Sequence, residues 1–176
     1  MSQVIDWIND TIINEREHRI DSSDIDDIRD FSLLWNLFED ICWNQNNENS
    51  NAFPLREILK IVSSKYQSLR SNQSDIDEIY NYFIDRYQDN NKFDNLKFRD
   101  NETENIAKTL LEKAINDSSS SITFEEKIKI ILSIIHRYRN NLFHGEKDMQ
   151  YIRLQKGNFE KSNKFLMLFI EKCKPS

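Results

Sequence analysis

The 176-residue sequence has few of the residues that tight turns, disulfides and metal sites require, with only 2 Gly, 2 Pro, 2 Cys and 3 His. Glycine supplies the positive φ angles of hairpin turns, so its scarcity argues against a β architecture. Gly145 and Gly157 stand alone, which excludes the clustered glycines of a phosphate-binding loop. Cys42 and Cys173 are too few for a disulfide framework or a cysteine-rich zinc site. The sequence therefore predicts free thiols in a reducing compartment.

Long hydrophobic runs are also missing. The longest nearly apolar run covers residues 130–135, whereas a membrane-spanning helix needs about 20 apolar residues. The N-terminus soon reaches polar residues, Asp6, Asn9 and Asp10, and shows no signal peptide. Hydrophobic residues make up 38% of the chain and aromatic residues 11%, which is enough for a core. We therefore expect one soluble, cytoplasmic domain over residues 1–176 with no membrane partner.

Apolar residues recur every three or four positions along most of the chain, which predicts helices. The expected helices cover about residues 2–19, 24–44, 54–66, 74–87, 106–114, 123–144 and 158–172. Asp24, Pro54 and Ser74 or Asp75 are expected to start helices. Thr123 and Glu126 form a capping-box pattern before the sixth helix, and Gly145 is expected to stop it. The predicted fold class is an all-α helical bundle.

Charge is unevenly distributed along the chain. The net charge of −6 argues against a general nucleic-acid binder. Residues 127–176 nevertheless contain 11 Lys and Arg against 4 Asp and Glu, while the preceding residues contain 13 against 26. Two explanations are open: the basic segment attracts a phosphate backbone, or it is the solvated lysine face of the last helices.

Residues 137–145, RYRNNLFHG, carry most of the chemical information. On a helical wheel Arg139 lies beside Leu132 and Ile135, at the edge of the buried stripe. A guanidinium there needs a carboxylate partner, or it must line a cleft or a subunit interface. Arg137 lies opposite that stripe and is expected to point to solvent.

His144 is expected at the end of the same helix. The partial negative charge of a helix C-terminus favours the imidazolium form, so His144 is suited to acid–base chemistry near neutral pH. An arginine nearby is able to hold a phosphate bidentately and stabilise charge that develops on it. Together these groups suit metal-independent RNA cleavage, in which the 2′-OH attacks the adjacent phosphate. The products would be a 2′,3′-cyclic phosphate and a 5′-OH end, and DNA would be spared.

The segment resembles the HEPN superfamily, whose ribonuclease members carry an Arg, four to six residues, and then a His. Arg139 and His144 have four residues between them, and the polar Asn140 follows the Arg, as is usual in that family. Arg137, six residues before the histidine, also fits the spacing, although the wheel and Asn140 favour Arg139. Residues 31–39, FSLLWNLFE, look like the aromatic-rich helix of stand-alone HEPN proteins from microbial defence and toxin–antitoxin loci. Their Glu39 resembles the acidic group that some members place near the Arg.

The resemblance implies a four- or five-helix core and a homodimer in which two Arg/His motifs form one composite cleft. It gives RNA as the partner and an antitoxin or defence-system protein as a further partner. The expected catalytic residues are Arg139, His144 and Asn140, with Glu39 and Arg137 in support. No cofactor and no metal are expected, because the three histidines lack ligand spacing.

Several alternatives stay open. The chain would otherwise be a non-catalytic HEPN-like module that binds a partner protein, or a helical regulator that binds RNA without cutting it. In the structural alternative, Arg139 pairs with Glu39 or Asp40 and His144 caps the helix. His136 is expected to be structural and His18 solvated. The three tryptophans, Trp7, Trp35 and Trp43, are expected to be core or interface anchors.

Overall fold

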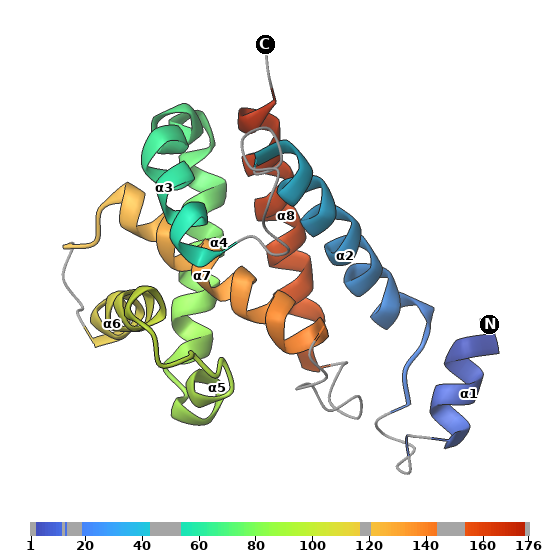
Figure 1. Ribbon diagram of the computed structural model, residues 1–176. Helices are drawn as coiled ribbons and strands as arrows, with labels where there is room; N and C mark the ends of the chain where they lie inside the picture. Colours follow the sequence, from blue (N-terminus) through green and yellow to red (C-terminus); the bar gives the residue numbers. More distant parts are fainter. Residues whose placement is uncertain are drawn as a thin grey trace.

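The computed structural model describes residues 3–11, 13, 19–42, 54–116, 121–143 and 154–174. Within these ranges every regular element is helical (Figure 1), so the predicted all-α class is confirmed. The elements are α1 (Gln3–Thr11), α2 (Ser22–Cys42), α3 (Leu55–Lys65), the 3₁₀ helix η2 (Tyr66–Asn72), α4 (Gln73–Tyr87), α5 (Asn90–Asp94), α6 (Glu102–Asn116), α7 (Phe124–Phe143) and α8 (Lys156–Cys173). None of the helices in the described ranges has the length and apolar character needed to cross a bilayer.

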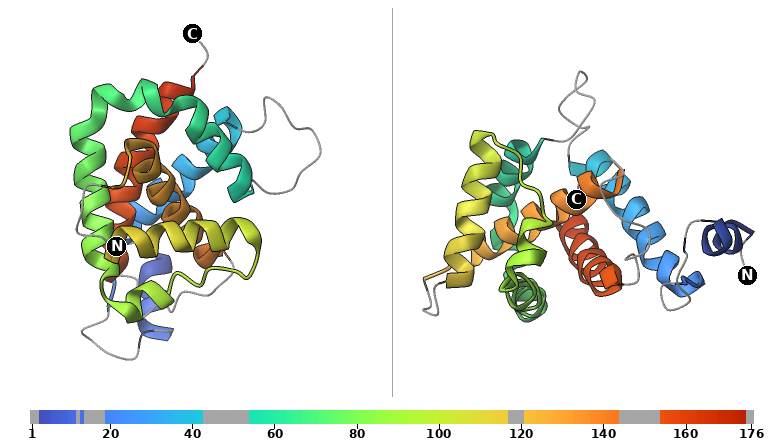
Figure 2. Two further views of the ribbon diagram at one scale, coloured as in Figure 1. Left: turned by 90° about the vertical axis from the view of Figure 1, so that its left-hand side faces the viewer. Right: turned by 90° about the horizontal axis from the view of Figure 1, so that it is seen from below.

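Helix α7 crosses the middle of the bundle. Figures 1 and 2 show α3, α4 and α6 on one side of it and α2 and α8 on the other. The predicted stripe is buried at Phe124, Ile128, Ile131, Ile135 and Tyr138, and Leu142 is partly buried. The buried surface is wider than that stripe, because every residue from 130 to 138 is buried. Neighbouring helices therefore cover α7 on several faces.

Helices α2 and α8 run parallel to each other and are joined by aromatic side chains. The Phe31 ring lies 5.1 Å from that of Phe159, and the Phe38 ring lies 5.8 Å from that of Phe169, both edge to face. Trp35 lies between the two phenylalanines of α2 and is also buried. Aromatic pairs of this geometry add to the free energy gained by burying apolar area.

Two capping motifs set the starts of α2 and α7. The Glu126 amide donates to Thr123 Oγ1 at 3.2 Å and the Thr123 amide donates to Glu126 Oε2 at 2.7 Å, which confirms the predicted capping box. The prediction that Asp24 caps α2 is wrong. Asp21 is the cap, since its carboxylate accepts hydrogen bonds from the amides of Ser23 and Asp24. Asp24 lies in the first turn of α2 and completes the capping motif, because its side chain accepts a hydrogen bond from the Asp21 amide at 2.9 Å.

The N-terminal segment differs from the expected helix over residues 2–19. Helix α1 ends at Thr11, and Ile13 and Ile20 lie outside helices. The Asn9 side chain donates to the Ile20 carbonyl and accepts from the Ile20 amide, which ties α1 to the start of α2. Ile5, Ile13 and Ile20 form a small hydrophobic cluster separate from the main core. Trp7 is 58% exposed on this helix, so it is no core anchor.

Other differences lie between α3 and α6. The sequence did not predict η2, and α4 begins at Gln73 with no side-chain cap, so the predicted caps Ser74 and Asp75 are wrong. The 3₁₀ helix leads directly into α4, which leaves no separate helix start to cap. Residues 88–105, which lie between two of the expected helices, contain α5, and its start is capped by the Asp89 side chain.

We expect the aromatic contact between α2 and α8 to be a major source of stability. Phe38→Ala removes a fully buried ring that contacts Phe169 and should lower the free energy of unfolding by about 3–5 kcal/mol. Its neighbour Leu37 is 48% exposed, so Leu37→Ala should change it by no more than about 0.5 kcal/mol. Denaturant unfolding of both variants checks this. Equal destabilisation by the two would contradict the packing described here.

Candidate functional site

Arg139 lies near the C-terminal end of α7 and faces α2. Its Nη2 lies 3.7 Å from Glu39 Oε1, and its Nη1 donates to Asn140 Oδ1 at 3.2 Å. The guanidinium carbon lies 6.0 Å from the centroid of the Trp35 ring. The side chain is 22% exposed, so one part of it contacts protein and another part faces solvent. Arg139 therefore has the carboxylate partner that its position demands, and that partner is Glu39.

Asn140 connects Arg139 to a buried histidine. Its amide oxygen accepts from Arg139, and its amide nitrogen lies 3.4 Å from His136 Nε2 and 3.5 Å from His136 Nδ1. The His136 ring packs 6.1 Å from the Trp35 ring, measured between centroids. Asn140 and His136 are both buried, so the prediction that His136 is structural agrees with its position. We call these five residues, Trp35, Glu39, His136, Arg139 and Asn140, the Arg139 cluster.

The ion pair within the Arg139 cluster is weak. An ion pair at 3.7 Å in which both side chains are about a quarter exposed is weak, because water screens it. A phosphate would offer Arg139 two charge-assisted hydrogen bonds in a fork geometry. The guanidinium is thus oriented by Glu39 and Asn140 and still accessible to an anion.

Arg137 occupies a different site, and the expectation that it points to solvent is wrong. Its side chain is only 2% exposed. Nη1 lies 3.2 Å from Glu104 Oε1 on α6, Nε donates to the Leu96 carbonyl at 2.9 Å, and Nη2 donates to Asn141 Oδ1 at 3.1 Å. Glu104 also accepts from the Arg99 amide at 2.7 Å. Arg137 therefore holds the segment between α5 and α6 against α7. Its side chain is not part of the Arg139 cluster.

The sequence contained a signal for this burial that the wheel argument missed. Arg137 shares one face of α7 with Asn141 and with two isoleucines, Ile130 and Ile134. A face with two isoleucines predicts burial, and a buried arginine predicts an acidic partner. Glu104 was not singled out, because nothing in its local sequence distinguishes it from the other acidic residues near the start of α6.

The structure brings together only part of the predicted site. Arg139, Asn140 and Glu39 are in contact, and Arg137 is separate. His144 and Gly145 lie outside the described residues, as do His18 and Trp43. In the part of the chain that is described, no three His, Cys, Asp or Glu side chains are grouped so as to hold a metal ion.

Three lysines of the basic C-terminal third form ion pairs with acidic residues of one helix. Lys161 lies 2.6 Å from Glu78, Lys164 lies 2.9 Å from Asp75, and Lys127 lies 2.8 Å from Asp77. All three of these acids belong to α4, so the excess positive charge of α7 and α8 meets the acidic face of that helix. This favours the interpretation that the charge bias is structural over an extended surface for a phosphate backbone.

Comparison with protein-family models, with curated proteins and with solved structures finds no match for this chain.

The two arginines should differ sharply in their effect on stability. Arg137→Met leaves Glu104 buried without its cation, which should cost about 3–5 kcal/mol of unfolding free energy. Arg139→Met removes a partly exposed pair and should cost about 1 kcal/mol or less. Thermal and urea unfolding measure both. The double variant Arg137→Met with Glu104→Leu should recover part of the loss, and similar costs for the two single variants would refute the assignment of Arg137 to a structural role.

Proposed function

We propose that the protein is a metal-independent endoribonuclease of HEPN type that acts as a homodimer in a toxin–antitoxin or antiviral defence setting. The 2′-OH of the RNA attacks the adjacent phosphate, and the chain is cut to a 2′,3′-cyclic phosphate and a 5′-OH end. Arg139 binds the scissile phosphate and stabilises the charge that develops on it. His144 transfers a proton or binds phosphate, and Asn140 orients the arginine.

One observation carries this proposal: Arg139 is held in place yet accessible at the end of a buried helix. Asn140 and Glu39 fix the guanidinium on two sides, and 22% of the side chain reaches solvent. Donors that are oriented before substrate binds need little reorganisation as negative charge develops in the transition state. A purely structural arginine would be expected to resemble Arg137, which is fully enclosed by its partners.

The remaining support comes from the sequence. Asn140 directly follows Arg139, and His144 directly follows Phe143, the last residue of α7. The aromatic-rich segment that resembles the family forms α2, which supplies Glu39 and Trp35 to the Arg139 cluster. Because Lys127, Lys161 and Lys164 are engaged in ion pairs with α4, we expect RNA to be held through few phosphates, with a shallow dependence of affinity on salt.

Cleavage of total cellular RNA in the presence of EDTA tests the proposal. Wild type should cut, and Arg139→Ala and His144→Ala should each lose activity by about 10²-fold or more. Arg29→Ala is the matched control, because Arg29 is an exposed arginine on α2 that pairs only with neighbouring aspartates. It should cut like wild type. All proteins are purified in parallel, since contaminating ribonuclease is the main artefact.

End mapping identifies the chemistry. The products should carry 2′,3′-cyclic phosphate and 5′-OH ends, and replacing the ribose at the cut site by deoxyribose should abolish cleavage. Equal cutting by all four proteins would mean that the activity belongs to a contaminant. Absence of cutting by wild type on every RNA would contradict the enzymatic proposal.

A second candidate function is a non-catalytic helical module that binds a protein partner such as an antitoxin. The observation that favours it is the exposure of Leu33 and Leu37 on α2. At 100° per residue Leu33 lies about 120° and Leu37 about 160° around α2 from Glu39, so they point away from the Arg139 cluster. The double variant Leu33→Ser with Leu37→Ser should therefore lose partner binding, measured by light scattering on the co-purified complex. It should keep RNA cleavage if both functions exist.

A further inference from the structure

The chain has two cysteines, and each of them ends one of the two parallel helices that form the aromatic contact. Cys42 is the last residue of α2, and Cys173 is the last residue of α8. Figure 1 shows that both helices end on the same side of the bundle. Because the two cysteines are far apart in the sequence, the packing of α2 against α8 is what brings them together.

The register of the contact between α2 and α8 places the two thiols opposite each other. The rings of Phe38 and Phe169 are in contact, with 5.8 Å between their centroids. Each cysteine follows its phenylalanine by four residues, so it lies on the same face of its helix, about 6 Å further along the axis. Since the helices are parallel, one turn along both of them leads from the phenylalanine contact to the cysteines. Both cysteine side chains pack against the main core and are neither fully buried nor fully exposed.

The two thiols interact, and their surroundings make them chemically unequal. The Cys42 thiol donates a hydrogen bond to the Cys173 sulfur, which lowers the pKa of Cys173, and the positive charge of Lys65 acts in the same direction against the effect of burial. The same hydrogen bond, together with burial, raises the pKa of Cys42. Lys65 is the last residue of α3, so a third helix end contributes to the site. Cys173 is therefore the thiol that ionises more readily, and the thiolate is the nucleophilic form of cysteine.

This environment differs from that of a cysteine that only fills space. A free cysteine in a core usually acts as a small hydrophobic side chain, which needs no charge beside it. Here Lys65 acts on both sulfurs, and it offsets the partial negative charge of the two helix C-termini, which disfavours a thiolate. Both side chains are also partly exposed, which gives a small oxidant access. Partial exposure and a neighbouring cation are the features of reactive cysteines.

We propose that Cys42 and Cys173 are a redox modification site, at which a peroxide forms a reversible disulfide that locks the end of α2 to the end of α8. The Cys173 thiolate attacks one oxygen of hydrogen peroxide, the O–O bond breaks, and a sulfenic acid forms while hydroxide leaves and takes up the thiol proton as water. The Cys42 thiol then attacks the sulfenic sulfur, the S–O bond breaks, and a second water leaves. Two thiols and one peroxide thus give one disulfide and two waters. Two molecules of a thiol such as glutathione reduce the bond again by exchange.

The disulfide would fix α2 in place next to the Arg139 cluster. The loop that it closes contains the helices from α3 to α8, and a bond that closes a long loop restricts the unfolded chain strongly and so stabilises the fold. Helix α2 also carries Glu39, three residues before Cys42, and Glu39 is the ion-pair partner of Arg139. The proposal concerns the thiol pair alone and does not depend on the proposed ribonuclease activity.

Oxidation of the reduced, full-length protein with hydrogen peroxide tests the thiol pair. The remaining thiols are alkylated with iodoacetamide, and the intact mass is measured. Wild type should lose both alkylation sites without forming a disulfide-linked dimer on a non-reducing gel, and peptide mapping should find Cys42 bonded to Cys173. The oxidised protein should unfold at a temperature about 5–15 °C higher than the reduced protein. Dithiothreitol should restore both the thiols and the lower unfolding temperature.

Single variants identify the attacking thiol. Cys42→Ser keeps Cys173 and a hydroxyl that donates to it, and it should accumulate a sulfenic acid that dimedone traps, because no second thiol is present to condense with it. Cys173→Ser keeps only Cys42 and should react with peroxide several-fold more slowly. Lys65→Met removes the neighbouring cation and should slow the oxidation of wild-type thiols several-fold. The matched control Lys60→Met alters a lysine of α3 that is 61% exposed, and it should react like wild type.

Three outcomes would overturn the proposal. In the first, both thiols of the folded wild type stay open to alkylation after oxidation, or pass to sulfinic and sulfonic acids without a disulfide. In the second, the disulfide forms only after the protein is denatured, with circular dichroism as the check on folding. In the third, Cys42 reacts as fast as Cys173, or Lys65→Met reacts as fast as Lys60→Met. All of these measurements follow the thiols and not RNA, so failure of the ribonuclease proposal would be seen separately.

Discussion

The burial of α7 is the constraint on which the rest of the structure depends. Every residue from 130 to 138 is buried, yet this stretch and the turn after it contain Ser133, His136, Arg137, Asn140 and Asn141. A buried polar group without a hydrogen bond costs free energy, so each of these side chains has a partner. Ser133 donates to the Lys129 carbonyl within the helix. The other side chains form hydrogen bonds to neighbouring segments or to one another, and the bonds to neighbouring segments hold those segments against α7.

The polar groups of α7 separate into two networks because the helix presents them on different faces. Arg137 and Asn141 share the face toward α6, where they bond to Glu104 and to the carbonyls of residues 95 and 96. His136, Asn140 and Arg139 face α2 and meet Trp35 and Glu39. In the first network each of the three nitrogens of the Arg137 guanidinium donates a hydrogen bond to protein. The second ends at the partly exposed Arg139, where an external anion has access.

Much of the architecture could be predicted from the sequence, since apolar spacing is a local property. The helix class, the capping box at Thr123 and the buried stripe of α7 all follow from residues within a few turns of each other. The cap of α2 was assigned to Asp24 instead of Asp21 because all four residues from 21 to 24 are good N-cap residues, and the local sequence does not rank them. The burial of Arg137 was missed because a wheel that centres on one stripe assumes that only one face of the helix is covered.

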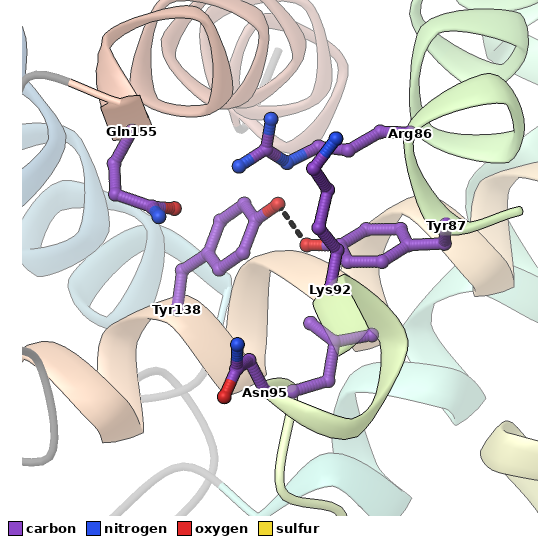
Figure 3. Close-up of a pocket in the computed structure, with 7 residues that line it drawn as sticks. Arg86, Tyr87, Lys92, Asn95, Tyr138 and Gln155 are labelled. Atoms are coloured by element: carbon purple, nitrogen blue, oxygen red, sulfur yellow. Dashed lines mark hydrogen bonds between the residues drawn. The ribbon is translucent and has the colours of Figure 1, made fainter. Parts of the chain in front are cut away.

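The candidate site was only partly predictable for the same reason. Arg139, Asn140 and Glu39 were found because a spacing pattern and an aromatic-rich helix pointed to them. The small pocket that Figure 3 shows could not be found in this way, because its residues come from α4, α5, α7 and the residues next to α5 and α8, and no pair of them has a telling spacing. Contacts between residues such as Tyr87 and Tyr138, 51 positions apart, are set by how helices pack.

For the binding of an anion, the local arrangement of charge matters more than the net charge of the chain. Lys127, Lys161 and Lys164 are paired with acids of α4 at distances of 2.6 to 2.9 Å, so these lysines present little unbalanced charge. Arg139 has a weaker ion pair, with Glu39 at 3.7 Å. An approaching anion gains most where positive charge is least compensated and hydrogen-bond donors are already oriented. A net charge of −6 therefore disfavours the general binding of polyanions, and the phosphate contact that we propose depends on the local geometry at Arg139.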